Sequence, residues 1–289
     1  MIAYVDGDWR EEAEATVPVH DRGFLLGDGV YDTCRIFDGS FFRFAQHAER
    51  LRVSAAVLAI PVPAVEELRS TADGLLRRNG RAALDHAVLR ITATRGSGGR
   101  GLGTTGAGPT RIVATVRPLP PDWRAAARRG WSCVTAATRH PPADVMPPAL
   151  KGQGRIFSLL ATLDAERAGC DQALLLSTDG HVTEGSTWNV FWRRGGRLRT
   201  PAVETGLLAG VTRSLVMEIA RDRGFEVEEG VWPREELDEA DEAFATMTSR
   251  GLVPLTSLDG RVFPGTGEAV EPLADAYWQQ VGRECRERR

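Results

Sequence analysis

The chain has 289 residues, a net charge of −3, 42% hydrophobic and 26% charged residues, which is an ordinary globular composition. This charge gives no sign of nucleic-acid binding, and no apolar run is long enough to span a membrane. The four cysteines and five histidines lack metal-type spacing, so we expect no metal site and a cytoplasmic protein with reduced thiols.

The first half of the chain predicts an α+β pattern. It begins with MIAYVDGDWREE, a charged hairpin pattern without the basic and apolar regions of a signal peptide. Asp38-Gly39 predicts a hairpin turn after a β-rich segment, and a glycine-rich loop follows residue 94. Hydrophobic periodicity gives the following elements: strand 30–37, helices 44–60 and 64–78, and strands 86–94 and 111–117.

A stiff proline-rich segment, residues 118–123, cannot extend either neighbouring element well and predicts a domain linker. We therefore expect a small N-terminal domain over residues 1–117 and a larger C-terminal domain over residues 124–289. Its expected elements are strands near 132–138, 173–177, 181–183, 189–193 and 243–248, and helices over 156–169, 210–224 and 273–285.

Lys151 is the only lysine among the 36 basic residues of the chain. A guanidinium keeps its proton, whereas a desolvated lysine amine can lose it and form an imine with a carbonyl. Lys151 follows a proline-rich segment and precedes a helix start. Composition alone leaves two explanations open: a preference for arginine that spared one surface lysine by chance, or a position that requires an amine.

Three further features suit an aldehyde cofactor that carries a phosphate. The loop 206–213 turns into a helix start, where free N–H groups and the helix dipole favour a phosphate. Glu184 follows a strand and could hold a pyridine nitrogen in its protonated state. Arg50 lies on a predicted helix, and its guanidinium could bind two phosphate oxygens. Taken singly, each is better explained as an ordinary glycine turn or a surface charge.

Together these residues resemble the fold-type IV enzymes that use pyridoxal 5'-phosphate. This family includes D-amino-acid aminotransferases, branched-chain aminotransferases and aminodeoxychorismate lyases. The resemblance covers nearly the whole chain and is carried, in order, by HDRGFLLGDGVYDT with HAERL, LKGQGR, DGHVTEGSTWNVFW, TPAVETGLLAGVTR and ADEAFATMTSRGLVPL.

The resemblance implies a fold, an assembly and a set of residue roles. The fold would be a small N-terminal α/β domain and a larger C-terminal domain with a β-barrel-like core. The protein would be a homodimer in which a loop of the partner completes each site. Lys151 would form the imine with the cofactor and move the substrate proton, and Glu184 would pair with the pyridine nitrogen. The phosphate would be held by Arg50, Val211, Thr212 and Thr248, with Leu208 packed on the ring.

The sequence departs from the family pattern just after the lysine. Gly154 stands where the family often has Asn, and Ile156 stands where branched-chain members have Tyr. The group that contacts the ring hydroxyl of the cofactor is therefore open, and Arg155 is the candidate.

The substrate side resembles the D-amino-acid aminotransferases most. Tyr31 matches a tyrosine that helps to bind the substrate carboxylate in these enzymes, and Arg100 matches their carboxylate-binding arginine. Leu102 replaces the histidine that they place two residues later, which could also admit (R)-primary amines. The glycine loop around Arg100 has G-x-G-x-x-G spacing but opens no helix, which excludes a dinucleotide motif.

We therefore predict a transaminase that moves amino groups from D-amino acids to a 2-oxo acid such as pyruvate or 2-oxoglutarate. The first alternative is an aminodeoxychorismate lyase that releases 4-aminobenzoate and pyruvate, favoured by RGSGGRG, NVFW and Arg155 but opposed by Gly185-Ser186. A branched-chain L-amino-acid aminotransferase is less favoured, because PLPPDW stands where that group carries its signature. A non-catalytic cofactor-binding protein would have little use for the amine of Lys151.

Overall fold

The computed structural model describes residues 1–263 and 267–287, and the chain forms two compact units. Unit 1 comprises Met1–Leu119, Ala149–Gly154 and the chain from Gly282 onward. Unit 2 comprises Pro120–Pro148 and Arg155–Val281. The segment that carries Lys151 thus belongs to the same unit as the first strands, which a single division at residues 118–123 does not anticipate.

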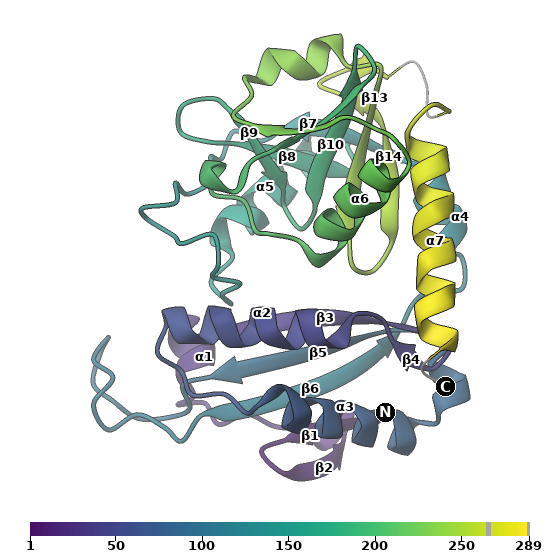
Figure 1. Cartoon of the computed structure of the whole chain (residues 1–289). Coiled ribbons are helices and arrows are strands. Elements are labelled where there is room, and N and C mark those ends of the chain that lie inside the picture. Colours follow the sequence, from purple (N-terminus) through teal and green to yellow (C-terminus); the bar gives the residue numbers. More distant parts are fainter. Residues whose placement is uncertain (264–266, 288–289) are drawn as a thin grey trace. The chain divides into compact units, whose positions relative to one another are not determined.

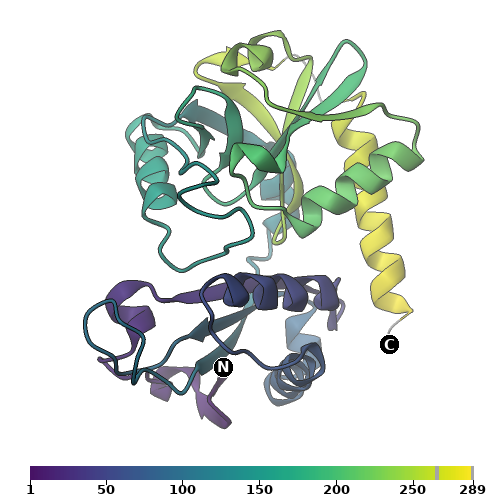
Figure 2. The same cartoon turned by 60° about the vertical axis from the view of Figure 1, so that its left-hand side comes forward.

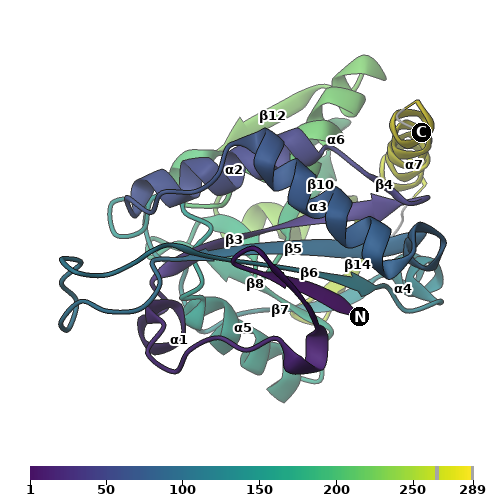
Figure 3. The same ribbon diagram turned by 90° about the horizontal axis from the view of Figure 1, so that it is seen from below.

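Unit 1 is built on a six-stranded antiparallel sheet in the order β2-β1-β6-β5-β3-β4. Helices α2 and α3 contact each other and cover one face of this sheet (Figures 1 and 3). The strands are β1 Ile2–Val5, β2 Asp8–Glu11, β3 Gly29–Phe37, β4 Ser40–Phe41, β5 His86–Thr94 and β6 Arg111–Pro118. The helices are α1 Arg22–Leu26, α2 Phe44–Val57 and α3 Val65–Asn79, with 3-10 turns at Glu12–Glu14 and Arg81–Leu84.

The local sequence explains these elements. Asp38 and Gly39 have φ values of 50° and 67°, as a tight hairpin between β3 and β4 requires. The apolar positions of α2 and α3 recur at helical spacing, so Leu51, Leu68 and Leu75 are all buried in one core against the sheet. Unit 1 therefore holds β3 and α2, the two elements next to Lys151, in a fixed packing.

Unit 2 contains a closed barrel. Six strands follow one another in the ring β10-β13-β14-β7-β8-β9, and β9 pairs again with β10 to close it (Figure 1). This ring confirms the predicted fold class, an α/β arrangement whose second part has a β-barrel core.

The strands of unit 2 are β7 Trp131–Thr135, β8 Gln172–Leu176, β9 Val182–Gly185, β10 Asn189–Arg194, β11 Arg197–Pro201, β12 Val227–Gly230, β13 Glu242–Met247, β14 Gly251–Leu258 and β15 Arg261–Val262. Its helices are α4 Trp123–Arg129, α5 Ile156–Arg167, α6 Val211–Asp222 and α7 Val270–Arg286, the last of which runs past Val281. Two 3-10 turns cover Val203–Thr205 and Arg234–Glu239. None of the helices in the described ranges has the length and apolarity needed to cross a membrane.

The side of helix α5 that carries Ile156, Leu159 and Leu160 does not face the core of unit 2. Ile156, Leu159 and Leu160 are 64%, 54% and 42% exposed, whereas the small residues Ala161 and Ala165 are buried. Small side chains allow the helix axis to approach β7 and β8 closely, and α5 contacts both strands. The helix begins where the sequence predicts it, but Ile156, Leu159 and Leu160, here called the leucine stripe, are left exposed by residues 1–263 and 267–287.

Candidate active site

The backbone of Lys151 is fixed within unit 1. The N–H of Tyr31 on β3 donates to the Lys151 carbonyl at 3.1 Å, and the Lys151 N–H donates to Ser54 Oγ at 3.0 Å. Ser54, buried on α2, in turn donates its hydroxyl to the Ala149 carbonyl at 2.6 Å. The segment 149–154 is therefore held against β3 and α2, and Lys151 itself is half-buried.

The side chain of Lys151 lies near the ring of Tyr31. The amine Nζ is 5.1 Å from the ring centroid, and the guanidinium carbon of Arg90 is 3.6 Å from the same centroid. Tyr31 is buried, while Arg90 is exposed. Both cations are within the range of favourable cation–π contacts. The structure thus brings the predicted substrate-side tyrosine next to the predicted catalytic amine.

Arg50 on α2 is bound to a carboxylate that the sequence analysis did not single out. Its Nε donates to Asp32 Oδ2 at 2.7 Å and its Nη2 donates to Asp32 Oδ1 at 2.9 Å. The His47 Nδ1 lies 2.8 Å from Asp32 Oδ1 and carries the hydrogen, since a carboxylate only accepts. The two bonds from Arg50 fix the plane of its guanidinium, the group predicted to bind phosphate.

The charges of this cluster follow from burial and from Arg50. Burial alone would raise the pKa of Asp32, but the Arg50 charge and the His47 bond outweigh it and lower the pKa below its ordinary value. Burial lowers the pKa of His47, an effect that the Asp32 carboxylate only partly opposes. Asp32 is therefore ionised and His47 neutral at neutral pH.

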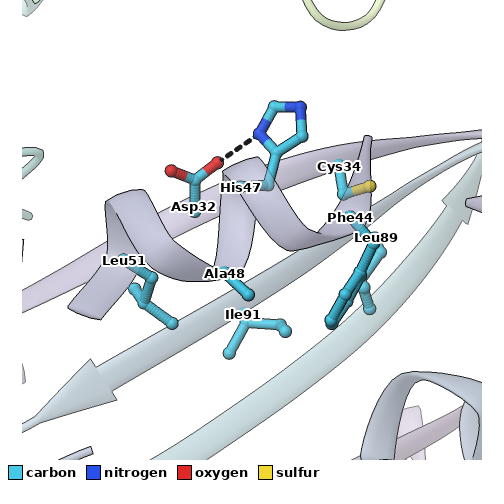
Figure 4. A pocket seen from close by; sticks show the side chains of 8 residues that line it. All are labelled: Asp32, Cys34, Phe44, His47, Ala48, Leu51, Leu89 and Ile91. Atoms are coloured by element: carbon cyan, nitrogen blue, oxygen red, sulfur yellow. Dashed lines mark hydrogen bonds and ion pairs between the residues drawn. The ribbon is translucent and has the colours of Figure 1, made fainter. Parts of the chain in front are cut away.

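Asp32 and His47 also line one side of a small, mostly apolar pocket beneath α2 (Figure 4). The lining residues are Asp32, Cys34, Phe44, His47, Ala48, Leu51, Leu89 and Ile91. Most of these side chains belong to the core of unit 1. The pocket is therefore a packing feature, and its polar end is the cluster that orients Arg50.

In unit 2, Glu184 near the end of β9 is buried, and one of its carboxylate oxygens is held by two hydrogen bonds. Its Oε2 accepts hydrogen bonds from Asn189 Nδ2 and from the Leu208 N–H, each at 3.1 Å. The same Asn189 Nδ2 donates to the Leu208 carbonyl at 2.9 Å. Asn189 stands opposite Glu184 in the pairing of β9 with β10. This asparagine, whose role the sequence analysis did not identify, clamps the loop before α6 to the carboxylate.

His140 approaches the other oxygen of Glu184. Its Nε2 lies 3.4 Å from Oε1, and its Nδ1 donates to the Pro141 carbonyl at 2.8 Å, since a carbonyl only accepts. His140 is buried, and its ring contacts Phe157 edge-on at 5.0 Å. The sequence showed only that this histidine has no metal-type spacing. In the structure its ring lies beside Glu184, the residue predicted to pair with the pyridine nitrogen.

The start of α6 has the character of an anion site. Gly210 is the N-cap, no side chain caps the helix, and its first turn carries no acidic residue. The first N–H groups of a helix have no acceptor within it, and the dipole attracts negative charge. A Cβ at position 210 would lie 2.2 Å from Asn189 Oδ1, so the glycine is required there. Thr212 is buried and Val211 half-buried in this first turn.

Unit 2 also carries three other residues with predicted roles at the cofactor: Leu208, Thr248 and Arg155. Leu208 is half-buried in the loop that Asn189 clamps, and Thr248 is half-buried in the turn after β13. Arg155 Nη2 donates to the Ser186 carbonyl at 2.7 Å and to Ser158 Oγ at 2.8 Å. Its contact with a ring hydroxyl stays a prediction.

Arg100, the residue predicted to bind the substrate carboxylate, is exposed, whereas Tyr31 is buried. Arg100 and Leu102 are exposed, and both belong to the glycine-rich loop between β5 and β6. The course of this loop can be followed in Figure 2. Within residues 1–263 no hydrogen bond or ion pair joins Arg100 to Tyr31. Tyr31 therefore lies next to Lys151, and the role of Arg100 at the substrate carboxylate stays a prediction.

The family follows from a match over most of the chain. The family model Amino-transferase class IV matches residues 29–258. The chain belongs to the class IV aminotransferases. The match contains Arg50, Lys151, Glu184 and the start of α6, all on the elements described above.

Relatives of several activities cover the aminotransferase almost completely. A Methanocaldococcus jannaschii protein, provisionally named a branched-chain-amino-acid aminotransferase, is 36% identical over 96% of this chain and 95% of its own. A D-alanine aminotransferase of Bacillus licheniformis is 32% identical, with 92% and 91% covered. An aminodeoxychorismate lyase of Bacillus subtilis is 29% identical, with 97% and 94% covered.

Solved structures agree with this family. The branched-chain aminotransferase of Thermoproteus uzoniensis with norvaline has a TM-score of 0.91 and 31% identity, with 98% of this chain and 96% of that chain covered. The T.th. branched-chain amino acid aminotransferase with pyridoxamine 5'-phosphate has a TM-score of 0.91 and 30% identity, with 98% and 94% covered.

The aminotransferase depends on pyridoxal 5'-phosphate, and its residues fit that group. The chain provides an amine on a fixed backbone at Lys151 and a buried carboxylate at Glu184. It also provides a helix start without a side-chain cap at Gly210, which suits a phosphate. These are the three chemical partners that an aldehyde, a pyridine nitrogen and a phosphate require.

Proposed function

We propose that this aminotransferase takes amino groups from D-amino acids, and also from (R)-primary amines, and passes them to a 2-oxo acid such as pyruvate or 2-oxoglutarate. The observation that carries the proposal is the position of Tyr31, whose ring lies 5.1 Å from Lys151 Nζ. A phenol at this place could donate to a substrate carboxylate close to the amine. The 32% identical D-alanine aminotransferase supports the same substrate class.

We propose the following roles for residues around the cofactor. When bound, pyridoxal 5'-phosphate supplies an aldehyde that reacts with amines and a ring that takes up the electron pair left by a departing proton. Lys151 binds the aldehyde carbon, Leu208 packs on the ring, and Glu184 holds a proton at the pyridine nitrogen. Arg50, Val211, Thr212 and Thr248 bind the phosphate.

Lys151 then acts as the base. When it is free of the cofactor and unprotonated, the Nζ of Lys151 would be the group that takes the proton from the substrate α-carbon and holds it for return. Asn189 and the Leu208 N–H hold Oε2 of Glu184, so this carboxylate would stay fixed as the partner of the pyridine nitrogen.

We further propose that two copies form a homodimer and that Arg100 binds the substrate carboxylate in the site of the partner copy. Two observations support this. Phe24 and Leu25 on α1 are 75% and 56% exposed, and the leucine stripe of α5 is also uncovered by its own chain. Arg100 is exposed on its loop. Sedimentation of the holoenzyme should give twice the chain mass of 31.4 kDa.

We also propose that the enzyme works in the cytoplasm. Its four cysteines, all within the described residues, form no disulfide, and three of them, Cys34, Cys133 and Cys285, are buried. Buried free thiols are typical of proteins from reducing compartments.

A branched-chain L-amino-acid aminotransferase is the second candidate. It is supported by the 36% identical relative and by the structure with norvaline. An aminodeoxychorismate lyase is the third, supported by the 29% identical relative. The lyase would use the same Lys151 and Glu184 but would release pyruvate from its own substrate.

Product analysis separates the three candidates. Incubation with D-alanine and 2-oxoglutarate should yield pyruvate and D-glutamate in equal amounts. Turnover of L-leucine with no turnover of D-alanine would establish the branched-chain activity instead. Consumption of aminodeoxychorismate alone, with release of 4-aminobenzoate, would establish the lyase.

A further inference from the structure

The loop between β5 and β6 is rich in glycines that adopt left-handed backbone conformations. Six of them have positive φ values between 55° and 107°: Gly96, Gly98, Gly99, Gly101, Gly106 and Gly108. Glycine loses more conformational freedom on ordering than any other residue. A loop of this composition needs contacts from outside itself to keep one shape.

Arg22, the first residue of α1, supplies such contacts. Its Nη1 donates to the carbonyls of Gly98 and Gly101 at 3.4 Å and 3.2 Å, and its Nη2 donates to the carbonyl of Leu102 at 3.3 Å. These three carbonyls lie on both sides of Arg100. One guanidinium therefore spans the part of the loop that carries the proposed carboxylate ligand.

A half-buried carboxylate fixes Arg22 in turn. Asp28 Oδ2 accepts from Arg22 Nε at 2.7 Å and from Arg95 Nε at 2.8 Å. Burial would raise the pKa of Asp28, but its bonds with Arg95 and Arg22 lower it overall, so Asp28 is ionised. The side chain of Arg22 is only 5% exposed. Its guanidinium thus has a charged anchor on one edge and the loop carbonyls on the other.

The glycine at position 99 makes this approach possible. A Cβ there would lie 2.8 Å from Arg22 Nη1 and 2.6 Å from the Gly103 carbonyl. Any other residue would push the loop away from the guanidinium. The backbone start of the loop is also tied to α1, because the Arg22 N–H donates to the Gly96 carbonyl at 2.9 Å.

We infer that Arg22 is a positioning residue for substrate specificity: it holds residues 98–102 in the one conformation that presents Arg100 to the substrate carboxylate. The inference rests on the proposed role of Arg100. Arginine suits this task because its rigid fork can reach several carbonyls at once, whereas a lysine ammonium is a point donor on a flexible stem.

Hydrogen exchange of the apoprotein tests the ordering of the loop without any activity. The N–H groups of Gly103, Ala107 and Gly108 are bonded within the loop and serve as reporters. Arg22→Gln should speed their exchange about tenfold. Arg95→Gln is the matched control, because Arg95 shares Asp28 but donates to the carbonyls of residues 58 and 59 instead. If Arg22→Gln destabilises the whole unit, Arg22→Lys provides the second variant. Unchanged exchange in both Arg22 variants would overturn the inference.

A double-mutant cycle tests the link to the substrate. Arg22→Gln should raise KM for D-alanine roughly tenfold with a smaller change in kcat. If Arg22 acts through Arg100, the variant with both Arg22→Gln and Arg100→Ala should lose no more than Arg100→Ala alone. Additive losses would overturn the inference while leaving the role of Arg100 intact. If Arg100→Ala leaves KM unchanged, the proposed role of Arg100 fails, and the specificity part of the inference fails with it.

Discussion

Replacing Asp32 by Asn should destabilise unit 1 through the loss of one buried charge. Asp32 accepts two bonds from Arg50, one from His47 and one from the Thr33 N–H at 2.7 Å. Every one of these partners is a donor. An asparagine keeps one acceptor oxygen but turns the other position into a donor that faces donors.

The expected cost follows from the burial of the pair. The side chains of Asp32 and Arg50 are 4% and 13% exposed. Breaking a buried ion pair from one side costs about 3–5 kcal/mol, because the remaining charge stays buried without its partner. Arg50 would keep its full charge, so the free energy of unfolding of unit 1 should fall by about that amount.

Native-state hydrogen exchange gives this free energy for unit 1 alone, which is needed because the chain has two units. The amides of the β3–β5 ladder report the opening of the sheet. Asp73→Asn is the matched control: Asp73 pairs with Arg69 at 3.0 Å on α3, with side chains 26% and 38% exposed. Such a surface pair should cost only about 0.3–0.5 kcal/mol.

The pH dependence of the Asp32→Asn effect has a definite sign. The pKa of Asp32 in the folded protein is lowered from an unfolded value of about 3.9. Its contribution to stability is therefore complete above the unfolded value and is lost as the pH falls through the folded pKa. The difference from the wild type should be constant above about pH 5 and shrink below pH 4. Equal costs for Asp32→Asn and Asp73→Asn, or a difference that persists undiminished at low pH, would refute the reasoning.

Three other substitutions test separate parts of the structure. Borohydride reduction of the wild-type holoenzyme should attach the cofactor covalently to the peptide that contains Lys151, as mass spectrometry can show, and Lys151→Arg should abolish this attachment. Attachment of the cofactor to another peptide would contradict the role of Lys151. Gly210→Ala should displace Asn189 and weaken cofactor binding by the apoenzyme roughly tenfold. Gly267→Ala is the control, because a Cβ there meets nothing within 4 Å, and it should leave cofactor binding unchanged. Equal cofactor affinities of the two variants would contradict the anion site. Glu242→Gln should destabilise unit 2 by about 1–3 kcal/mol in urea unfolding, because this buried carboxylate accepts from the N–H groups of Glu268, Ala269 and Val270 where α7 begins; a neutral result would contradict that cap.

Much of the architecture could be predicted because local chemistry dictates it. The turn at Asp38-Gly39 is a place where only a few residue types are compatible with the backbone. Lys151 stood out because no arginine can replace an amine that forms an imine. The predicted fold class is confirmed by the strand ring of unit 2 and by the solved relatives, and the predicted cofactor by the family match.

Other features could not be predicted, because they depend on contacts between distant elements. Asp32 meets Arg50 only when β3 and α2 pack together, and a carboxylate within a strand gives no sign of such a partner. Asn189 reaches Glu184 through the register of β9 and β10, which periodicity does not fix. The leucine stripe of α5 shows a further limit: apolar spacing predicts the helix, but not which face this chain itself covers.

The most direct test of the proposed activity is the first half-reaction of the holoenzyme with matched enantiomers. Cofactor absorbance would be followed in single turnovers with D- and L-alanine and with D- and L-leucine, in the absence of a 2-oxo acid. We expect loss of the yellow form with the D-enantiomers, and no such change when Lys151 is replaced by Arg. Conversion by L-leucine alone, or by neither pair, would contradict it.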